Sequence, residues 1–399
     1  MSPSRRRSWL PLGLALGSVL LFLVIVGHRF VPVLVDYLDP DTCVGCHAET
    51  NGHLVSQWMS SVHFSQGLHC VGCHGDDHEA MFAVDGDVSS RVCAECHPKE
   101  YDEFGRSSHA KAVKTAEGDA RFLVAPEAVQ RQGCLSCHNI GRVYPDGGVG
   151  ECSHCHSAHR YSVEEARGAH ACDGCHMGPD HPQAEAWAAS KHGLVYQASG
   201  DESVAPTCTT CHMAGETGHD NAGNLTLGRS SSGATFVGKA TGVPMKQLER
   251  AEFKTRRASM VKICRRCHSK SFARRHLADA DDIKLRSDAL IAEAAYLIRE
   301  LERDGLLDPM PKARPPHPKA GHTLVLGGDQ LYSDTSVVEQ LFFEMMKFHH
   351  AATFKGAYHF SPDHTHWFGW AKLQASLTRI RGEAKRLRGA AKTATEITQ

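Results

Sequence analysis

The chain has 399 residues, which is enough for one large domain or two medium ones. Its formal net charge of -1 gives no strong electrostatic field, so the composition offers no support for nucleic-acid binding. The 16 cysteines and 28 histidines are far above ordinary usage. The chemistry of the chain is therefore expected to reside in cysteine and histidine motifs.

Residues 1–36 are predicted to form a membrane anchor and a short linker. Residues 5–7 are arginines, and the apolar stretch over residues 9–26 is about long enough to cross a bilayer. The positive end of such a segment stays in the cytoplasm, so we expect the remaining chain on the periplasmic side of a bacterial inner membrane. A cleaved signal peptide, which would leave a soluble periplasmic protein, is the alternative, although no small-residue cleavage site follows the apolar run.

Residues 37–270 are predicted to form an octahaem domain, because every cysteine lies in a Cys-x-x-Cys-His motif. The 16 cysteines, two to a motif, make eight motifs and leave none over. In this signature both thiols bond to a haem and the adjacent histidine is the proximal ligand of its iron; disulfides and zinc sites do not require that histidine. We therefore expect eight covalently bound haem c groups. The cysteines are Cys43, Cys46, Cys70, Cys73, Cys93, Cys96, Cys134, Cys137, Cys152, Cys155, Cys172, Cys175, Cys208, Cys211, Cys264 and Cys267. The proximal histidines are His47, His74, His97, His138, His156, His176, His212 and His268.

Most of these haems should need a second, distal histidine, because an electron-transfer haem takes two strong axial ligands, whereas an enzyme haem keeps one position open. The segments WMSSVH, FGRSSH and WAASKH form a weak repeat, with an aromatic residue and a serine at fixed places before the final histidine. Each segment could leave one haem and carry its histidine to another. The distal candidates are His63, His109 and His192 from the repeat, together with His78, His159, His219 and His359. The sequence leaves their pairing with the proximal histidines open.

Residues 271–399 contain no haem motif and are predicted to be helical. Apolar residues recur at helical spacing over residues 281–305, with Asp281 and Asp282 as the expected caps at the start. Residues 336–360 and 366–389 predict two further helices after a Pro/Gly-rich loop. The predicted fold class is therefore mainly α, a multihaem cytochrome c with little strand, a haem-packed core and long C-terminal helices.

The stretch from Cys152 to Gly193 resembles the octahaem hydroxylamine oxidoreductase family. The resemblance rests on the closely spaced fifth and sixth haem motifs, on MGPDHPQ and SKHG, and on GAYHFSPDHTHWFGW near the C-terminal end. It implies a mainly helical fold, seven haems with two histidine ligands each, and one catalytic haem with an open distal side. The family attaches that haem by its fourth motif, which here is Cys134, Cys137 and His138.

The same resemblance implies roles for residues outside the motifs. Asp180 and His181 match the family's distal Asp–His pair, which handles protons at the substrate. The alternative is that Asp180 caps a helix starting at Pro182. Oxidising members of the family carry a tyrosine bonded to the catalytic haem; Tyr358 lies in the right region, Tyr332 is a weaker option, and a packing role is the alternative for either.

The resemblance implies redox chemistry on a small nitrogen compound. We expect multi-electron reduction of nitrite or hydroxylamine, since a membrane anchor suits electron input from a quinol-oxidising partner or another cytochrome. Oxidation of hydroxylamine to nitrite or nitric oxide is the first alternative. A pure electron-transfer cytochrome and a tetrathionate-type reductase are further alternatives, the latter disfavoured because no Cys-x-x-Cys-Lys motif occurs. The family also suggests a homotrimer, with the C-terminal helices as its contact.

Overall fold

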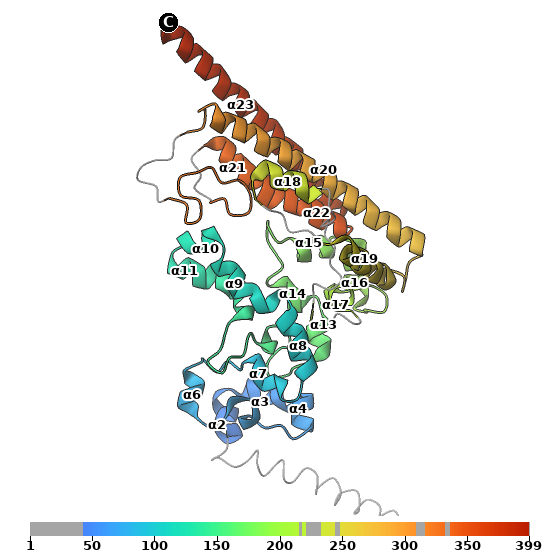
Figure 1. Ribbon diagram of the computed structural model, residues 1–399. Coiled ribbons are helices and arrows are strands. Elements are labelled where there is room, and N and C mark those ends of the chain that lie inside the picture. Colours follow the sequence, from blue (N-terminus) through green and yellow to red (C-terminus); the bar gives the residue numbers. More distant parts are fainter. Residues whose placement is uncertain are drawn as a thin grey trace, which may run out of the picture. The chain divides into compact units, whose positions relative to one another are not determined.

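The computed structural model describes residues 43–214, 218–220, 233–243, 248–308, 316–331 and 336–398. Helices make up the regular structure of these residues (Figure 1), apart from isolated bridges between Val143 and Val149 and between His317 and Gly321. The predicted mainly-α class is confirmed. The predicted anchor lies outside the described residues, and none of the helices inside them is long and apolar enough to cross a membrane.

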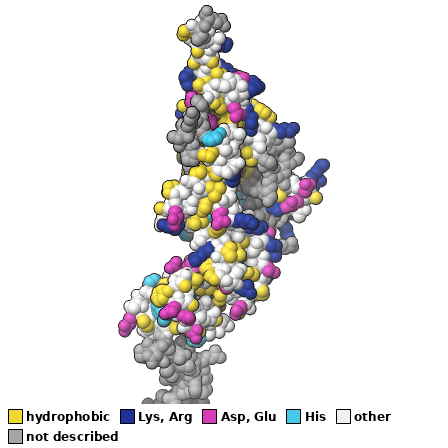
Figure 2. All heavy atoms as spheres, turned by 60° about the vertical axis from the view of Figure 1, so that its left-hand side comes forward, with side chains coloured by type: hydrophobic (Ala, Val, Ile, Leu, Met, Phe, Trp, Pro, Cys, Tyr) yellow, Lys and Arg dark blue, Asp and Glu magenta, His cyan; other side chains and the backbone are white. Residues whose placement is uncertain are grey.

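The chain folds into two compact units, of which the first comprises residues 1–86 and 157–162. Its described helices are α2 (Cys43–Thr50), α3 (Gly52–Met59), α4 (Val62–Ser65), α5 (Val71–His74) and α6 (His78–Phe82). Residues 43–86 contain no lysine or arginine. On the face shown in Figure 2, this unit, next to the grey residues, displays acidic side chains beside histidines. This unit is therefore acidic.

The second unit comprises residues 87–156 and 163–399, so it joins six of the haem motifs to the C-terminal helices. The predicted boundary at residue 270 rests on where the motifs end, and it stays a prediction. The motif-bearing part is built of short elements: α7 (Ser90–Ala94), α8 (Pro98–Arg106), η1 (His109–Lys111), α9 (Ala112–Glu117), α10 (Ala120–Val124), α11 (Glu127–Val129), η2 (Gln130–Cys134), α12 (Leu135–His138), η3 (Asn139–Gly141), η4 (Cys152–His154), α13 (Val163–Arg167), α14 (His170–Asp173), α15 (Gln183–Ala188), α16 (Lys191–Ser199) and α17 (Cys208–His212).

The C-terminal part of the second unit contains the long helices. Its elements are α18 (Gly233–Thr241), α19 (Arg250–Cys264), α20 (Lys270–Arg303), α21 (Val337–Glu344), the π-helical segment η6 (Met345–His350), α22 (Ala351–Tyr358), η7 (His364–Trp370) and α23 (Ala371–Thr398). Helices α20 and α23 pack side by side (Figure 1). The long C-terminal helices predicted from the periodicity are present.

The start of α20 differs from the prediction. Asp281 and Asp282 were expected as caps, but they lie inside the helix. Ser269 is the actual cap, since its side chain accepts a hydrogen bond from the backbone N–H of Phe272. No proline or glycine interrupts residues 270–281, so nothing stops the helix from running through the two aspartates.

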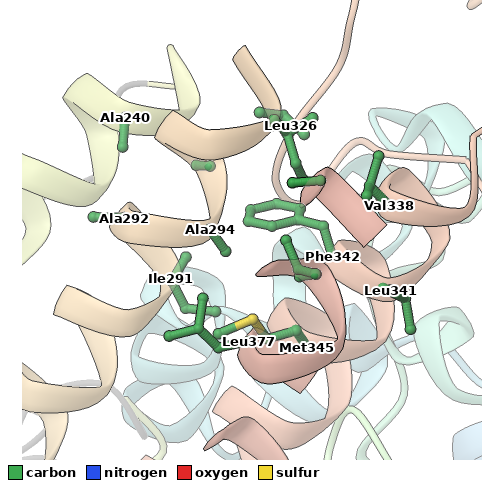
Figure 3. Close-up of a cluster of buried hydrophobic side chains, with 14 of the residues drawn as sticks. Ala240, Ile291, Ala292, Ala294, Leu326, Val338, Leu341, Phe342, Met345 and Leu377 are labelled. Atoms are coloured by element: carbon green, nitrogen blue, oxygen red, sulfur yellow. The ribbon is translucent and has the colours of Figure 1, made fainter. Parts of the chain in front are cut away.

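The side-chain core of the second unit lies between these C-terminal helices. Figure 3 shows Phe342 of α21 pointing toward Ala294 of α20, with Ile291, Met345 and Leu377 beside it. All five side chains are fully buried. Burying a large apolar side chain contributes roughly 1.5–3 kcal/mol. This core therefore fixes α20, α21 and α23, and with them the segments η6 and α22 that connect α21 to α23.

Helix α22 is held close to η7 by glycine. A Cβ atom on Gly356 would lie 2.5 Å from the backbone nitrogen of Thr365, and one on Gly369 would lie 2.5 Å from the Cα atom of Thr353. Only glycine allows two backbones to approach this closely. These glycines belong to the GAYHFSPDHTHWFGW stretch, so part of that signature is explained by packing rather than by chemistry.

Candidate functional site

Each haem motif forms a single helical turn that gathers its three functional side chains. All 16 cysteines are free, so none is used in a disulfide. In the motifs at residues 93–97, 152–156 and 264–268, the histidine N–H donates to the carbonyl of the first cysteine at 2.8–2.9 Å. This bond puts both thiols and the imidazole on the same turn. The geometry fits two thioether bonds and one axial ligand on a single haem.

The motif-bearing segments also lack a side-chain core of their own. Of the described residues up to 214, the buried apolar ones are Val44, Val55, Tyr144 and small alanines. Large apolar residues such as Phe82 and Val62 are exposed. A chain with so little buried apolar material needs another source of packing, and haem supplies it. The residues present therefore fit the prosthetic group that the motifs call for.

Six of the seven distal candidates lie opposite a proximal histidine. The pairs and the separations of their ring centres are His47–His78 (6.4 Å), His74–His159 (5.9 Å), His156–His219 (6.3 Å), His176–His109 (6.0 Å), His212–His359 (6.2 Å) and His268–His192 (6.0 Å). A metal–imidazole bond is about 2 Å long and a ring centre lies roughly 1 Å behind its nitrogen, so two rings on one iron have centres about 6 Å apart. Each pair thus leaves the space of one iron between its rings.

The seventh distal candidate, His63, packs against Tyr161 with ring centres 5.4 Å apart. Its segment belongs to the repeat seen in the sequence, and the structure explains that repeat. Ser61, Ser107 and Ser190 are all buried and accept a hydrogen bond from the N–H three residues further on. This serine contact starts the turn that presents the following histidine.

Burial keeps several of these imidazoles neutral, as metal ligation requires. Desolvation, followed by the charge of His109, lowers the pKa of His176 to about 4. Desolvation and the neighbouring His359 likewise lower the pKa of His212 to about 4. The Nδ1–H of His359 donates to the carbonyl of Lys355 at 2.7 Å, which leaves Nε2 as the metal-binding nitrogen.

The fourth motif differs from the six paired ones. The Nδ1–H of His138 donates to the carbonyl of Ala112 at 3.0 Å, so its Nε2 is also available to a metal. No histidine ring of the described residues lies opposite His138. The site at Cys134, Cys137 and His138 could therefore hold a haem with one open side.

Charged groups surround this fourth motif. The Cys137 sulfur lies 3.9 Å from the carbonyl of Gly174 in the sixth motif, which leads directly to Asp180 and His181. On the other side Cys134 feels the charges of Asp119 and Arg121, which form an ion pair with each other. This arrangement brings the predicted Asp–His pair toward the motif that has no opposing histidine.

The Asp180 carboxylate connects the Asp–His pair to η6. One of its oxygens accepts from the Nδ1–H of His181 at 2.8 Å, and the other binds the Lys347 ammonium at 3.1 Å. The Lys355 ammonium also donates to the Asp180 backbone carbonyl at 2.5 Å. Burial alone would raise the pKa of Asp180, but His181 and Lys347 outweigh it and hold the pKa well below its usual range. Asp180 is therefore a permanent carboxylate that orients His181.

The helix-cap alternative for Asp180 is contradicted. Helix α15 begins at Gln183, its cap residue is Pro182, and it has no side-chain cap. Tyr358 also lies away from the fourth motif's charged neighbours: its hydroxyl donates to Asp281 at 2.6 Å, and Asp281 pairs with Arg257 at 2.8 Å. Burial and Asp281 raise the pKa of Tyr358 far above its usual value. Tyr332, the weaker option, lies outside the described residues.

Sequence reasoning missed Lys347 and Lys355. They lie on η6 and α22, far along the chain from Asp180, and an isolated lysine in a helix carries no signal of its own. Burial is the first cause that lowers the pKa of Lys355 to about 8, and Lys347 adds to it, while Asp180 acts in the opposite direction. Two cations and one carboxylate thus meet beside an exposed imidazole, whose side chain is 47% accessible.

Comparison with known proteins gives the family. The family model described as "Seven times multi-haem cytochrome CxxCH" matches residues 39–315, which is more than half of the chain. The chain belongs to this multihaem cytochrome family. The cytochrome therefore carries covalently bound haem c on its Cys-x-x-Cys-His motifs, in agreement with the prediction.

Individual relatives narrow the likeness. A Kuenenia stuttgartiensis protein named as a probable nitrite reductase-hydroxylamine oxidoreductase fusion is 29% identical over 90% of this chain and 53% of its own length. The cytochrome thus spans about half of that relative. A chain of a Kuenenia stuttgartiensis complex titled as reducing and HAO-like shares the fold, with a TM-score of 0.75 and 24% identity over 92% of this chain and 88% of that one. A hypothetical multihaem protein also shares it, with a TM-score of 0.69 and 19% identity over 88% and 96%. The predicted resemblance to hydroxylamine oxidoreductases is confirmed.

Proposed function

We propose that this cytochrome is a multihaem oxidoreductase that reduces nitrite or hydroxylamine at a haem attached to Cys134 and Cys137, with His138 as the proximal ligand. Seven further haems with two histidine ligands each would complete a set of eight. The observation that carries the proposal is the Asp180 carboxylate held between His181 and Lys347 in the neighbourhood of the motif that has no opposing histidine. The names of the fusion relative and of the reducing complex support the same class of reaction.

The residues of the chain divide the work of such a reaction. When bound, the haem supplies an open coordination position and an electron reservoir. His181, held in one tautomer by Asp180, presents its Nε2 atom, where it delivers protons to the substrate side. The ammonium groups of Lys347 and Lys355 favour an anionic substrate such as nitrite over a neutral one.

Reduction is favoured over oxidation by the position of Tyr358. Its hydroxyl is engaged by Asp281 and is therefore not available for a bond to a haem of its own chain. Delivery of electrons by a quinol-oxidising partner or another cytochrome, a periplasmic location with an N-terminal anchor, and a homotrimer remain predictions that accompany this proposal.

The test is an EPR and optical titration of the as-isolated and reduced protein with nitrite and with hydroxylamine. We expect one high-spin or five-coordinate signal that shifts on addition of either ligand, above a background of low-spin haems. His181→Gln should retain that shift but lose turnover. A spectrum of low-spin haems alone, without any response to the ligands, would show an electron-transfer cytochrome instead.

A further inference from the structure

An exposed group of cations surrounds the eighth haem motif. It consists of Lys254, Lys262, Arg265, Arg266, Lys270 and Arg274, all exposed, on helix α19, on the start of α20 and in the turn between them; we call it the basic surface. Between Glu252 and Asp279 the chain contains no aspartate or glutamate. In a chain whose formal net charge is -1, this concentration is a local feature.

Intramolecular ion pairs do not account for the basic surface. The nearby carboxylates of Glu252 and Asp281 are already bound, by Arg256 and Arg257. Among the described residues, the six cations of the basic surface have no carboxylate partner. Exposed like charges repel one another, so their accumulation on one surface costs stability and needs another explanation.

The shape of the region matches a docking surface. A hollow between α19 and α20 is lined by Phe253, Val261 and Leu277, with cations of the basic surface at its edge. An apolar centre with a charged rim is the common plan of protein interfaces. The rim charges of such interfaces govern the association rate and its salt dependence.

The basic surface coincides with a haem motif that is built for electron transfer. Arg265 and Arg266 are the two variable residues of the motif itself, and Cys267 is exposed. His192 lies opposite the proximal His268, so this site has no open side for a substrate. A site that is closed to substrate and yet lies at the surface is suited to exchange electrons with another protein.

We propose that the basic surface docks an electron-carrier protein with an acidic face. On docking, the carrier loses one electron and the cytochrome gains one; no atom is transferred. The first unit, whose described residues 43–86 lack lysine and arginine, offers no such surface for an acidic partner. The inference requires a haem on the eighth motif but does not depend on the reaction proposed at His138, so either proposal can fail alone.

The experiment compares two charge reversals of equal size in the full-length, haem-loaded protein. The first, K254E/K262E/R274E, changes the basic surface without touching the motif. The control, R379E/K385E/K392E, changes three exposed cations of α23, which lie along another basic hollow with no haem motif in its lining. Haem content and absorption spectra establish that both variants are loaded, and K254Q/K262Q/R274Q provides a milder change if the reversal fails to mature.

The probe is an acidic flavodoxin. Stopped-flow absorbance measures the second-order rate at which reduced flavodoxin reduces the cytochrome, and surface plasmon resonance measures the Kd of oxidised flavodoxin. In about 10 mM salt, where charges act over roughly 30 Å, the reversal should slow reduction about tenfold or more and weaken binding by a similar factor. In about 1 M salt, where they act over roughly 3 Å, wild type and variant should agree. The α23 control should match wild type at both salt concentrations.

Three results would overturn the proposal. An equal loss in the α23 control would show a general effect of net charge. A loss that high salt does not remove would show damage to the site. Unchanged flavodoxin binding together with a shifted haem midpoint potential would show that these cations neutralise haem propionates, and salt-dependent self-association abolished by the reversal would assign the surface to a second copy of the chain.

Discussion

Two clusters of the second unit combine the same three side chains in different surroundings. Asp180, His181 and Lys347 meet near the fourth haem motif, and Asp288, His350 and Lys284 meet among the C-terminal helices. In both clusters an aspartate oxygen lies 2.8 Å from an imidazole nitrogen. The segment η6 serves both, because it carries Lys347 as well as His350.

Burial separates the two clusters. The side chain of Asp288 is 2% accessible and that of His350 is 9%, whereas Asp180 and His181 are at 28% and 47%. The aspartate binds Nδ1 in His181 but Nε2 in His350, so only His181 keeps its outer nitrogen for a substrate. Identical groups can therefore stabilise a core in one place and move protons in another, and access to the outside decides between these roles.

The largest expected effect is on turnover, from changes in the exposed cluster. His181→Gln or Asp180→Asn should lower kcat about 10²–10⁴-fold, the usual range for a lost proton-transfer group. The thermal unfolding midpoint and the haem spectra should stay at their wild-type values. His170→Gln is the matched control, since that histidine also pairs with an aspartate, at 3.1 Å, but is 97% accessible. Wild-type turnover in His181→Gln would exclude it from the reaction.

The next effect is on stability, from the buried cluster. Asp288→Asn leaves Lys284 without its charge partner, and loss of one member of a buried pair costs about 3–5 kcal/mol. Chemical denaturation followed by far-UV circular dichroism should show this loss, while turnover per folded molecule is retained. Asp282→Asn on the same helix breaks only the exposed pair with Arg286 and should cost less than about 1 kcal/mol. Equal losses in both variants would remove the distinction between buried and exposed pairs.

How much of this could be predicted follows from the range of each signal. Asp180 and His181 are neighbours in the sequence, and a Cys-x-x-Cys-His motif closes on one turn, so local patterns sufficed for both. Lys347 reaches Asp180 from a distant segment, and His359 lies opposite His212 for the same reason. Those contacts depend on how α20, α21 and α23 pack, which no local pattern encodes. The start of α20 was missed because Ser269 looked like part of a loop after the last motif.

A smaller effect on turnover should come from Lys347. Lys347→Met removes one of the two groups that hold the Asp180 carboxylate, but leaves the contact with His181. Lys347 thus acts through Asp180 as a positioning residue, and its loss should lower kcat/KM about tenfold. Lys347→Arg, which keeps the charge, should restore most of the activity, and Lys385→Met on α23 is the neutral control. A loss that Lys347→Arg does not restore would contradict the positioning role.

The smallest effect is the pH dependence of stability that the buried cluster imposes. Burial, the larger cause, lowers the pKa of His350 below its usual value despite the opposing contact with Asp288. The unfolded chain therefore takes up a proton near pH 6.5 that the folded chain refuses, and stability falls as the pH drops below about 6.5. The pKa of Asp288 is also lowered, because His350 and Lys284 outweigh the desolvation that would raise it, so its share is present above about pH 4 and lost below.

Both groups act in the same direction, so the free energy of unfolding should decline in two stages as the solution is acidified. One group changes it by at most about 1.4 kcal/mol per pH unit. Denaturation series at pH 7.5, 5.5 and 3.5 should show the first stage lost in His350→Gln and the second lost in Asp288→Asn. If His350→Gln kept the decline between the first two values, another histidine would be responsible, and His350 would be a packed imidazole without a linked proton.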